Sequence, residues 1–425
     1  MANEDKEIET IPVGPLGLIP LKSCESLGKK VDDFLVRWRS ARQSEHKSTL
    51  AFTGYQRDTY IIPTTLSRFG TGEGKGELGT SVRGDDLFLM VDVCNHSLTY
   101  SLFGMKNHMS PDDHFQDLKR IISAAAGKAR RINVIMPYLY ESRQETRSGR
   151  ESLDCAMALH EMVDMGVENI ITFDAHDPRV QNAIPLKGFE TVTPMYQFVK
   201  ALLAAEPDIQ VDSAHMMVVS PDAHGMSRAI QFANRMGLDL GTFYKRRDYT
   251  RIENGRYPVV AMEFLGDKVE GKDIIVVDDM ISSGDGAREV ARELKKRKAN
   301  RVFICATFGM FTNGLELFDR YFEDGLIDRI LTTNLVYQSP ELLSRKYYVN
   351  VDMSKYIALI IDNLNHDSSI SEFLEPSERV QRAIERHEAE RKAREEEEAK
   401  KAAEEAAKAA AKAAEEAAKA AEEEK

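Results

Sequence analysis

The sequence has little cysteine and no long apolar run, and each shortage excludes a class of protein. Its four cysteines lie far apart and form no CxxC pair; they are Cys24, Cys94, Cys155 and Cys305. Neither a disulfide framework nor a zinc site is therefore indicated, and we expect reduced, buried thiols. No apolar run approaches the roughly 18 residues that span a bilayer. Because the start of the chain is acidic and polar, unlike a signal peptide, we expect a cytoplasmic protein without membrane contact.

Positive charge is also in deficit. The 425 residues carry 57 lysines and arginines against 69 aspartates and glutamates, a formal net charge of −12. This balance argues against nucleic acid as a partner, although an acidic protein can bind nucleotides if its site cations are local and metal ions add charge. A hydrophobic content of 42% is enough for the cores of about two or three domains.

The most informative stretch runs from Asp273 to Leu294. Residues 274–277 are four branched apolar residues in a row, which is typical of a strand buried on both faces of a parallel sheet. Asp278 and Asp279 follow at the end of this strand. The loop 282–286 then leads into a helix whose apolar residues recur at i, i+3, i+4 and i+7. The pattern predicts a strand, a loop and a helix N-terminus.

Such a helix N-terminus favours phosphate, because its first N–H groups lack intrahelical partners and the helix dipole adds positive charge. The paired aspartates would repel a phosphate, so a ribose whose hydroxyls donate to Asp278 and Asp279 is the better partner for them. The plain alternative is an Asp-Asp turn that caps an ordinary helix, since short motifs match by chance at a high rate.

Polar residues also follow other predicted strands. Arg143 and Gln144 come after the strand 132–137, His176 follows the strand 170–173, and Asp222 follows the strand 216–219. Ligands of open α/β sheets bind beyond the carboxyl ends of the strands. A histidine in this position is more often a structural hydrogen-bond partner, and the cationic run Lys245-Arg-Arg247 read alone would be solvated surface.

In order along the chain, these segments resemble motifs of the ribose-phosphate pyrophosphokinase (phosphoribosyl pyrophosphate synthetase) family. The segment 68–73 is similar to the family's R-F-x-D-G-E, 137–145 to its P-Y-x-x-Y-x-R-Q-D, 174–176 to D-L-H, 220–222 to S-P-D and 245–247 to K-R-R. The stretch after residue 277 resembles its ribose-5-phosphate loop. The resemblance covers roughly residues 17 to 374.

The resemblance implies a role for each matched position. Ribose 5-phosphate would be bound by Asp278, Asp279, Ser282, Ser283, Gly284, Asp285 and Gly286, ATP by Phe69, Thr71, Gly72, Glu73, Arg143 and Gln144, and Mg2+ by His176 and Asp222. Lys245 and Arg247 would be catalytic, on a mobile loop over the transferring group. The implied reaction moves the diphosphoryl group of ATP to the 1-hydroxyl of ribose 5-phosphate, in a homo-oligomer whose subunits share the ATP site.

The implied fold is α/β, with two tandem phosphoribosyltransferase-like domains built on parallel sheets. We expect an irregular lead-in over 1–20, domains over 21–190 and 191–374, and a charged helical tail over 375–425. Beyond Ile384 the tail has no apolar residue larger than alanine, and Glu and Lys recur at i, i+4. These features predict an exposed single helix that acts as a spacing or solubilising arm.

Two other functions fit parts of the sequence. A catalytically silent, synthetase-like regulatory subunit is one, because Asp285 places a carboxylate in the phosphate loop. A type I phosphoribosyltransferase is the other, although one such domain needs about half this length and the ATP-site resemblance would then be unexplained.

Overall fold

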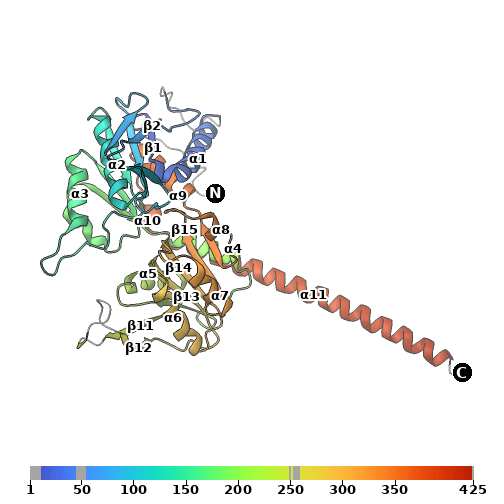
Figure 1. Cartoon of the computed structure of the whole chain (residues 1–425). Helices are drawn as coiled ribbons and strands as arrows, with labels where there is room; N and C mark the ends of the chain where they lie inside the picture. Colours follow the sequence, from blue (N-terminus) through green and yellow to red (C-terminus); the bar gives the residue numbers. More distant parts are fainter. Residues whose placement is uncertain (1–10, 45–53, 248–249, 252–258, 424–425) are drawn as a thin grey trace.

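The computed structural model describes residues 11–44, 54–247, 250–251 and 259–423; within these ranges it leaves out the side chains of 43–44, 245, 247, 259–260, 372 and 411–423. The chain forms two β-sheets with helices packed around them, and a long helix projects from one end (Figure 1). This architecture confirms the predicted α/β fold with parallel sheets. None of the described helices combines the length and the apolar character needed to cross a bilayer.

The first sheet is parallel, with the strand order β1-β4-β7-β8-β9. Its strands are β1 (Leu16–Pro20), β4 (Asp86–Met90), β7 (Arg131–Ile135), β8 (Asn169–Phe173) and β9 (Gly188–Val192). The helices of this half are α1 (Glu25–Ser44), α2 (Pro111–Ala125) and α3 (Asp154–Asp164), with a short 3-10 turn at Lys22–Cys24 and another at Pro178–Ala183. Every residue of β4 is buried, as expected for a central strand covered on both faces.

The second sheet has the order β12-β11-β10-β13-β14-β15-β16, and only the edge strand β12 is antiparallel to its neighbour among the described residues. Its strands are β10 (Met216–Ser220), β11 (Asp239–Arg247), β12 (Val259–Leu265), β13 (Asp273–Ile281), β14 (Val302–Gly309), β15 (Arg329–Thr333) and β16 (Tyr348–Val351). The helices are α4 (Met195–Ala205), α5 (Met226–Met236), α6 (Asp285–Lys296), α7 (Glu316–Glu323), α8 (Pro340–Leu343), α9 (Ser354–Asn365) and α10 (Ser371–Leu374). The proposed boundary at 190/191 falls inside β9, and the domain limits stay a prediction.

Two antiparallel hairpins extend the first half. β2 (Thr64–Arg68) pairs with β3 (Gly74–Leu78). β5 (Thr99–Leu102) pairs with β6 (Met105–His108), a hairpin that the sequence did not predict. The loops touch, because the amide of Phe103 donates to the carbonyl of Gly70.

Helix α9 from the second half of the chain packs against α1 of the first half. Its Asp362 is 1% exposed and accepts hydrogen bonds from both Arg39 and Arg42, while Asn365 donates to Asp86 at the start of β4. These buried polar contacts join the two halves side by side.

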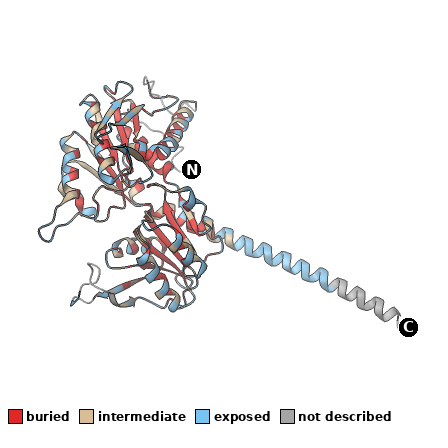
Figure 2. Cartoon of the chain, in the orientation of Figure 1, coloured by how far each residue is buried: buried red, intermediate tan, exposed pale blue. Residues whose placement is uncertain are grey.

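The long tail helix α11 (Ser377–Glu423) is confirmed, but the expectation that it is exposed along its whole length is wrong for its first turns (Figure 2). Val380, Ile384 and His387 are buried, and α11 packs on α4 and α5. Nε2 of His387 forms a hydrogen bond of 2.9 Å with the carbonyl oxygen of Ile209. From Glu395 onward, the described side chains are exposed.

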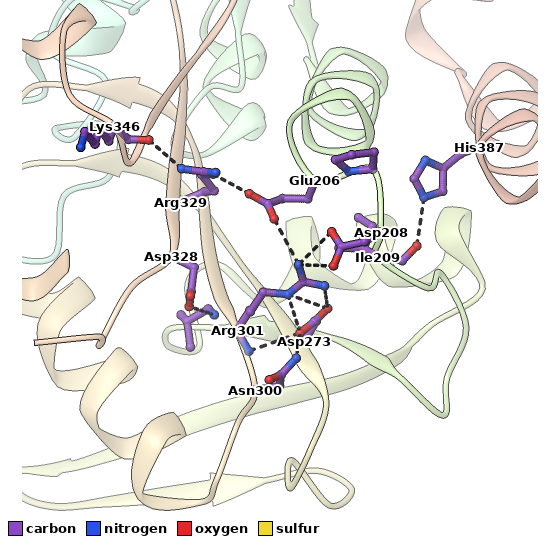
Figure 3. A network of polar contacts seen from close by, with 12 residues as sticks. Glu206, Asp208, Ile209, Asp273, Asn300, Arg301, Asp328, Arg329, Lys346 and His387 are labelled. Atoms are coloured by element: carbon purple, nitrogen blue, oxygen red, sulfur yellow. Dashed lines mark hydrogen bonds and ion pairs between the residues drawn. The ribbon is translucent and has the colours of Figure 1, made fainter. Parts of the chain in front are cut away.

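The loop that receives α11 is fixed by an ionic network at the amino ends of the second sheet's strands (Figure 3). Arg301 pairs with Asp273, Glu206 and Asp208 at 2.7 to 3.1 Å. Arg329 adds an ion pair to Glu206. This network lies on the edge of the sheet opposite the twin aspartates.

Candidate active site

Side chains at the carboxyl ends of the two sheets contact one another. His176 follows β8 of the first sheet, and Asp279 lies near the end of β13 of the second. Nδ1 of His176 and Oδ2 of Asp279 are 2.6 Å apart. The structure therefore brings two of the predicted site residues together from segments that are 103 positions apart in the chain.

The register of the second sheet gathers further predicted residues at the same edge. β10 ends at Ser220, which lies opposite Thr242 of β11, and Val219 lies opposite Val276 of β13. The strands β11 and β13, which flank β10, both extend beyond the end of β10. The extension of β11 contains Lys245, and that of β13 contains the twin aspartates. Neighbouring strands are about 4.8 Å apart, so the two extensions stand about 10 Å apart with the turn after β10 between them. That turn carries Asp222.

The cationic run lies on a strand rather than on a loop. Lys245 and Arg247 pair with Met262 and Val259 of β12, so the expectation of a loop at this position is wrong. The side chains of Lys245 and Arg247, and residues 248–249 and 252–258 between the strands, lie outside the described part of the structure. The catalytic roles of these two residues stay a prediction.

The environment shifts the pKa values of the twin aspartates in opposite directions. Burial and the neighbouring Asp279 raise the pKa of Asp278 well above its ordinary value. Burial also opposes the ionisation of Asp279, but the hydrogen bond from His176 and the charge of Arg228 lower its pKa. The same hydrogen bond raises the pKa of His176. The two carboxyl groups are therefore not equivalent: the environment favours the ionised form of Asp279 and disfavours that of Asp278.

Arg228 is a site residue that the sequence did not reveal. It lies on α5, and its Nε atom donates to both carboxylate oxygens of Asp174 at 2.8 Å. Thr307 of β14 donates to the same carboxylate at 2.7 Å. Asp174 belongs to the first half of the chain, whereas Arg228 and Thr307 belong to the second.

The predicted phosphate loop is shorter than expected, because α6 already begins at Asp285. Gly284 precedes it with a φ of 90°, in the left-handed region that favours glycine. The hydroxyl of Ser283 donates to the Asp285 carboxylate at 3.0 Å. Asp285 stands in the first turn, where a negative charge stabilises a helix, and so it occupies the positive end that a phosphate would seek.

His176 and Asp222 fit a metal that is shared with substrate phosphates. Among the described residues no group of three or more His, Cys, Asp or Glu side chains could hold a metal alone. Mg2+ commonly takes one or two protein ligands and completes its shell with phosphates and water. Because Nδ1 of His176 is bonded to Asp279, its Nε2 is the nitrogen available for a metal, an arrangement common in metal sites. The Asp222 side chain is 42% exposed.

The predicted ATP-binding residues lie in two separate places. Phe69, which is 56% exposed, leads the loop between β2 and β3, where Gly72 has a φ of 93° and Thr71 donates to Glu73 at 2.9 Å. Arg143 is exposed, and Gln144 donates to the carbonyls of Thr146 and Ser152 in its own loop. Within the described residues no hydrogen bond or ion pair joins these two sets, so their common role stays a prediction.

Two family profiles match the chain. The profile described as the N-terminal domain of ribose phosphate pyrophosphokinase matches residues 16–166, and the one described as the phosphoribosyl synthetase-associated domain matches residues 256–375. A ribose-phosphate pyrophosphokinase from Vibrio cholerae is 27% identical over 313 residues, which is 72% of this chain and 89% of the relative. The enzyme of the same name from Shewanella oneidensis is 28% identical over 310 residues, again 72% of this chain and 89% of the relative.

A solved structure shares the fold. The phosphoribosylpyrophosphate synthetase from Mycobacterium smegmatis superposes with a TM-score of 0.63 at 18% sequence identity, and the match covers 83% of this chain and 99% of that one. The likeness therefore extends over both sheets and their arrangement.

Proposed function

Because this chain belongs to the ribose-phosphate pyrophosphokinase family, we propose that it transfers the β,γ-diphosphoryl group of ATP to ribose 5-phosphate. The oxygen of the ribose 1-hydroxyl forms a bond to the β-phosphorus, and the bond from that phosphorus to the α,β-bridging oxygen breaks. AMP leaves with the bridging oxygen, and the hydroxyl proton passes to water. The products are phosphoribosyl pyrophosphate and AMP.

The observation that carries this proposal is the contact between His176 and Asp279 at the facing sheet edges. It allows one substrate to be held from each half of the chain within reach of the other. Phosphoryl transfer depends on such positioning and on neutralising charge more than on covalent help from the protein.

In this proposal the second half of the chain binds the sugar phosphate. Asp278 and Asp279 accept hydrogen bonds from the ribose hydroxyls. The backbone N–H groups of the loop before α6 face the 5-phosphate, where the helix dipole also favours an anion. Ser283 and Gly284 supply the nearest of these groups.

The nucleotide would be bound mainly by the first half, with Asp222 contributed by the second half. His176 with Asp222 would hold Mg2+ on the ATP phosphates, where the ion would neutralise charge that develops during transfer. Arg143 and Gln144 follow β7 at the same sheet edge, and Phe69, which is 56% exposed, would contact the nucleotide of a neighbouring copy. The active species is then a homo-oligomer in which two subunits complete each ATP site.

The function is tested with the purified full chain, ribose 5-phosphate, ATP and Mg2+, with AMP measured by chromatography. Lys245→Ala should lower kcat far more than it weakens ATP binding, because its ammonium group acts on the transferring group. Arg246→Ala is the matched control. Arg246 is the neighbouring cation, its side chain is exposed and it has no role in this proposal, so its loss should leave both quantities unchanged. An equal loss in kcat and in ATP affinity for Lys245→Ala would contradict the proposed role.

Asp285 favours a second candidate, a silent subunit that binds nucleotide or sugar phosphate and regulates a partner. Its carboxylate stands at the helix end where the 5-phosphate would lie. A wild-type protein that binds ATP or ribose 5-phosphate in calorimetry but releases no AMP would favour this function. Pyrophosphate release from phosphoribosyl pyrophosphate that requires a nucleobase would favour a type I phosphoribosyltransferase instead.

A further inference from the structure

We infer that Arg228 is a positioning residue for this reaction: with Thr307 it clamps Asp174 across the two halves and so sets His176 against Asp279. The inference rests on the proposed function, which gives His176 and Asp279 their roles. Arg228 lies on α5 close enough for its charge to lower the pKa of Asp279, but it is assigned no substrate contact in the proposed function.

The clamp is a largely buried carboxylate from one half that accepts hydrogen bonds from two residues of the other half. The side chains of Arg228 and Asp174 are 17% and 12% exposed. Both carboxylate oxygens of Asp174 accept a hydrogen bond from Nε of Arg228 at 2.8 Å, and one of them also accepts a hydrogen bond from the Thr307 hydroxyl at 2.7 Å. Charged hydrogen bonds that are shielded from water are stronger and better defined than exposed ones.

The turn that follows Asp174 is rigid, so the clamp acts on His176. Asp174 has a φ of 44°, a conformation rare for residues other than glycine. The backbone N–H groups of the turn are all bonded: that of Asp174 to the Val192 carbonyl at 3.0 Å, that of Ala175 to the Thr191 hydroxyl at 3.0 Å, and that of His176 to the Ser142 hydroxyl at 3.3 Å. A shift of Asp174 relative to the second half therefore moves His176 relative to Asp279.

Arg301 provides a control for the general cost of losing a partly buried arginine. It also pairs with several carboxylates, and its side chain is 21% exposed. Its carboxylate partners all belong to the second half (Figure 3), and among them Asp273 begins β13, whereas the twin aspartates stand near the end of that strand. Loss of Arg301 should destabilise the fold without changing the distance between the proposed ATP and ribose groups.

The test compares Arg228→Met and Arg228→Lys with Arg301→Met in the full-length chain. Arg228→Met should lower kcat by about 10- to 100-fold, as misplacement of a reacting group by about 1 Å does, and should raise the Mg2+ concentration at half-maximal rate. Lysine keeps the charge and one hydrogen bond, so Arg228→Lys should recover part of both losses. Arg301→Met should lower Tm while kcat and the Mg2+ requirement stay within twofold of wild type.

Thr307→Val is a milder variant in case Arg228→Met does not fold. Valine has the shape of threonine without the hydroxyl, and it should lower kcat by a smaller factor with little change in Tm. The inference is overturned if Arg228→Lys and Thr307→Val lose stability but keep wild-type kcat and Mg2+ dependence, or if Arg301→Met loses as much activity as the Arg228 variants.

A spectroscopic readout separates failure of this inference from failure of the proposed function. In protein labelled with 15N-histidine, the His176 ring, assigned through His176→Gln, should show Nδ1 bonded to a carboxylate. Arg228→Met should shift that resonance, and Arg301→Met should not. If wild type releases no AMP yet these shifts appear, the function fails and the clamp stands. If wild type is active and Arg228→Met leaves the resonance unchanged, the clamp is refuted while the proposed function stands.

Discussion

Replacing Gly284 by alanine places a methyl group where the fold has no room for it. The added Cβ would lie 2.3 Å from the ring of Phe318, and the backbone there has a φ of 90°. The left-handed conformation costs a residue with a side chain about 1 to 2 kcal/mol, and overpacking a core costs about 1 to 3 kcal/mol. We expect Gly284→Ala to lower the free energy of unfolding by about 2 to 5 kcal/mol, measured by urea unfolding with circular dichroism.

Gly286, two positions further on, is the matched control. A Cβ there meets no atom within 4 Å, and the residue already lies in α6. Gly286→Ala should therefore stabilise the chain by about 0.5 to 1 kcal/mol, because alanine is the better helix former. The two substitutions should thus change stability in opposite directions.

A double-mutant cycle isolates the clash itself. Phe318→Ala alone should cost about 3 to 5 kcal/mol, and in that background Gly284→Ala should cost about 1 to 3 kcal/mol less than in wild type. If the two changes are additive, or if Gly284→Ala is as stable as wild type, the close approach of this loop to α7 is refuted. The KM for ribose 5-phosphate should rise in Gly284→Ala, since the displaced loop carries the proposed phosphate donors.

Three further predictions follow from particular residues. Burial alone would raise the pKa of Asp362, but Arg39 and Arg42 hold it at about 2 against an ordinary 3.8. This shift contributes about 2 kcal/mol to the free energy of unfolding above pH 4. The contribution should be lost as the pH falls toward 2, and acid unfolding of Asp362→Asn should lack this loss. Deleting 396–425 should leave Tm unchanged, whereas deleting 377–425 should cost about 3 to 6 kcal/mol because Val380 and Ile384 lose their packing. Asp285→Asn should lower the KM for ribose 5-phosphate by about 2- to 5-fold, since a charge at a helix N-terminus is worth about 0.3 to 1 kcal/mol; an unchanged KM in saturation kinetics would contradict this.

The buried strands of both sheets were predictable from sequence. Parallel strands covered on both faces read as continuous apolar runs, as in residues 216–219 and 274–277. Because functional groups of such sheets lie beyond the strand ends, the same runs also indicated His176, Asp222 and the twin aspartates. The hydrogen bond between His176 and Asp279 depends on how the two halves of the chain pack together, and local sequence patterns carry no information about that packing.

Three further features of the structure had a weak sequence signal or none: the role of Arg228, the β5–β6 hairpin and the docking of α11. Arg228 is one arginine on an amphipathic helix, and only the fold supplies Asp174 as its partner. The β5–β6 hairpin is polar and incompletely buried, so it lacks a hydrophobic alternation. The docking of α11 did have a signal, because Val380, Ile384 and His387 recur at i, i+4 and i+7, the spacing of one helix face.

The central claim is that residues at the facing sheet edges catalyse transfer of an intact diphosphoryl group from ATP to ribose 5-phosphate. Phosphorus NMR of the full chain with ATP, ribose 5-phosphate and Mg2+ tests it most directly. We expect AMP to accumulate in step with a new pair of coupled diphosphate resonances from a group attached to the ribose 1-oxygen. Formation of ADP with a single transferred phosphoryl group, or an unchanged spectrum, would contradict the claim.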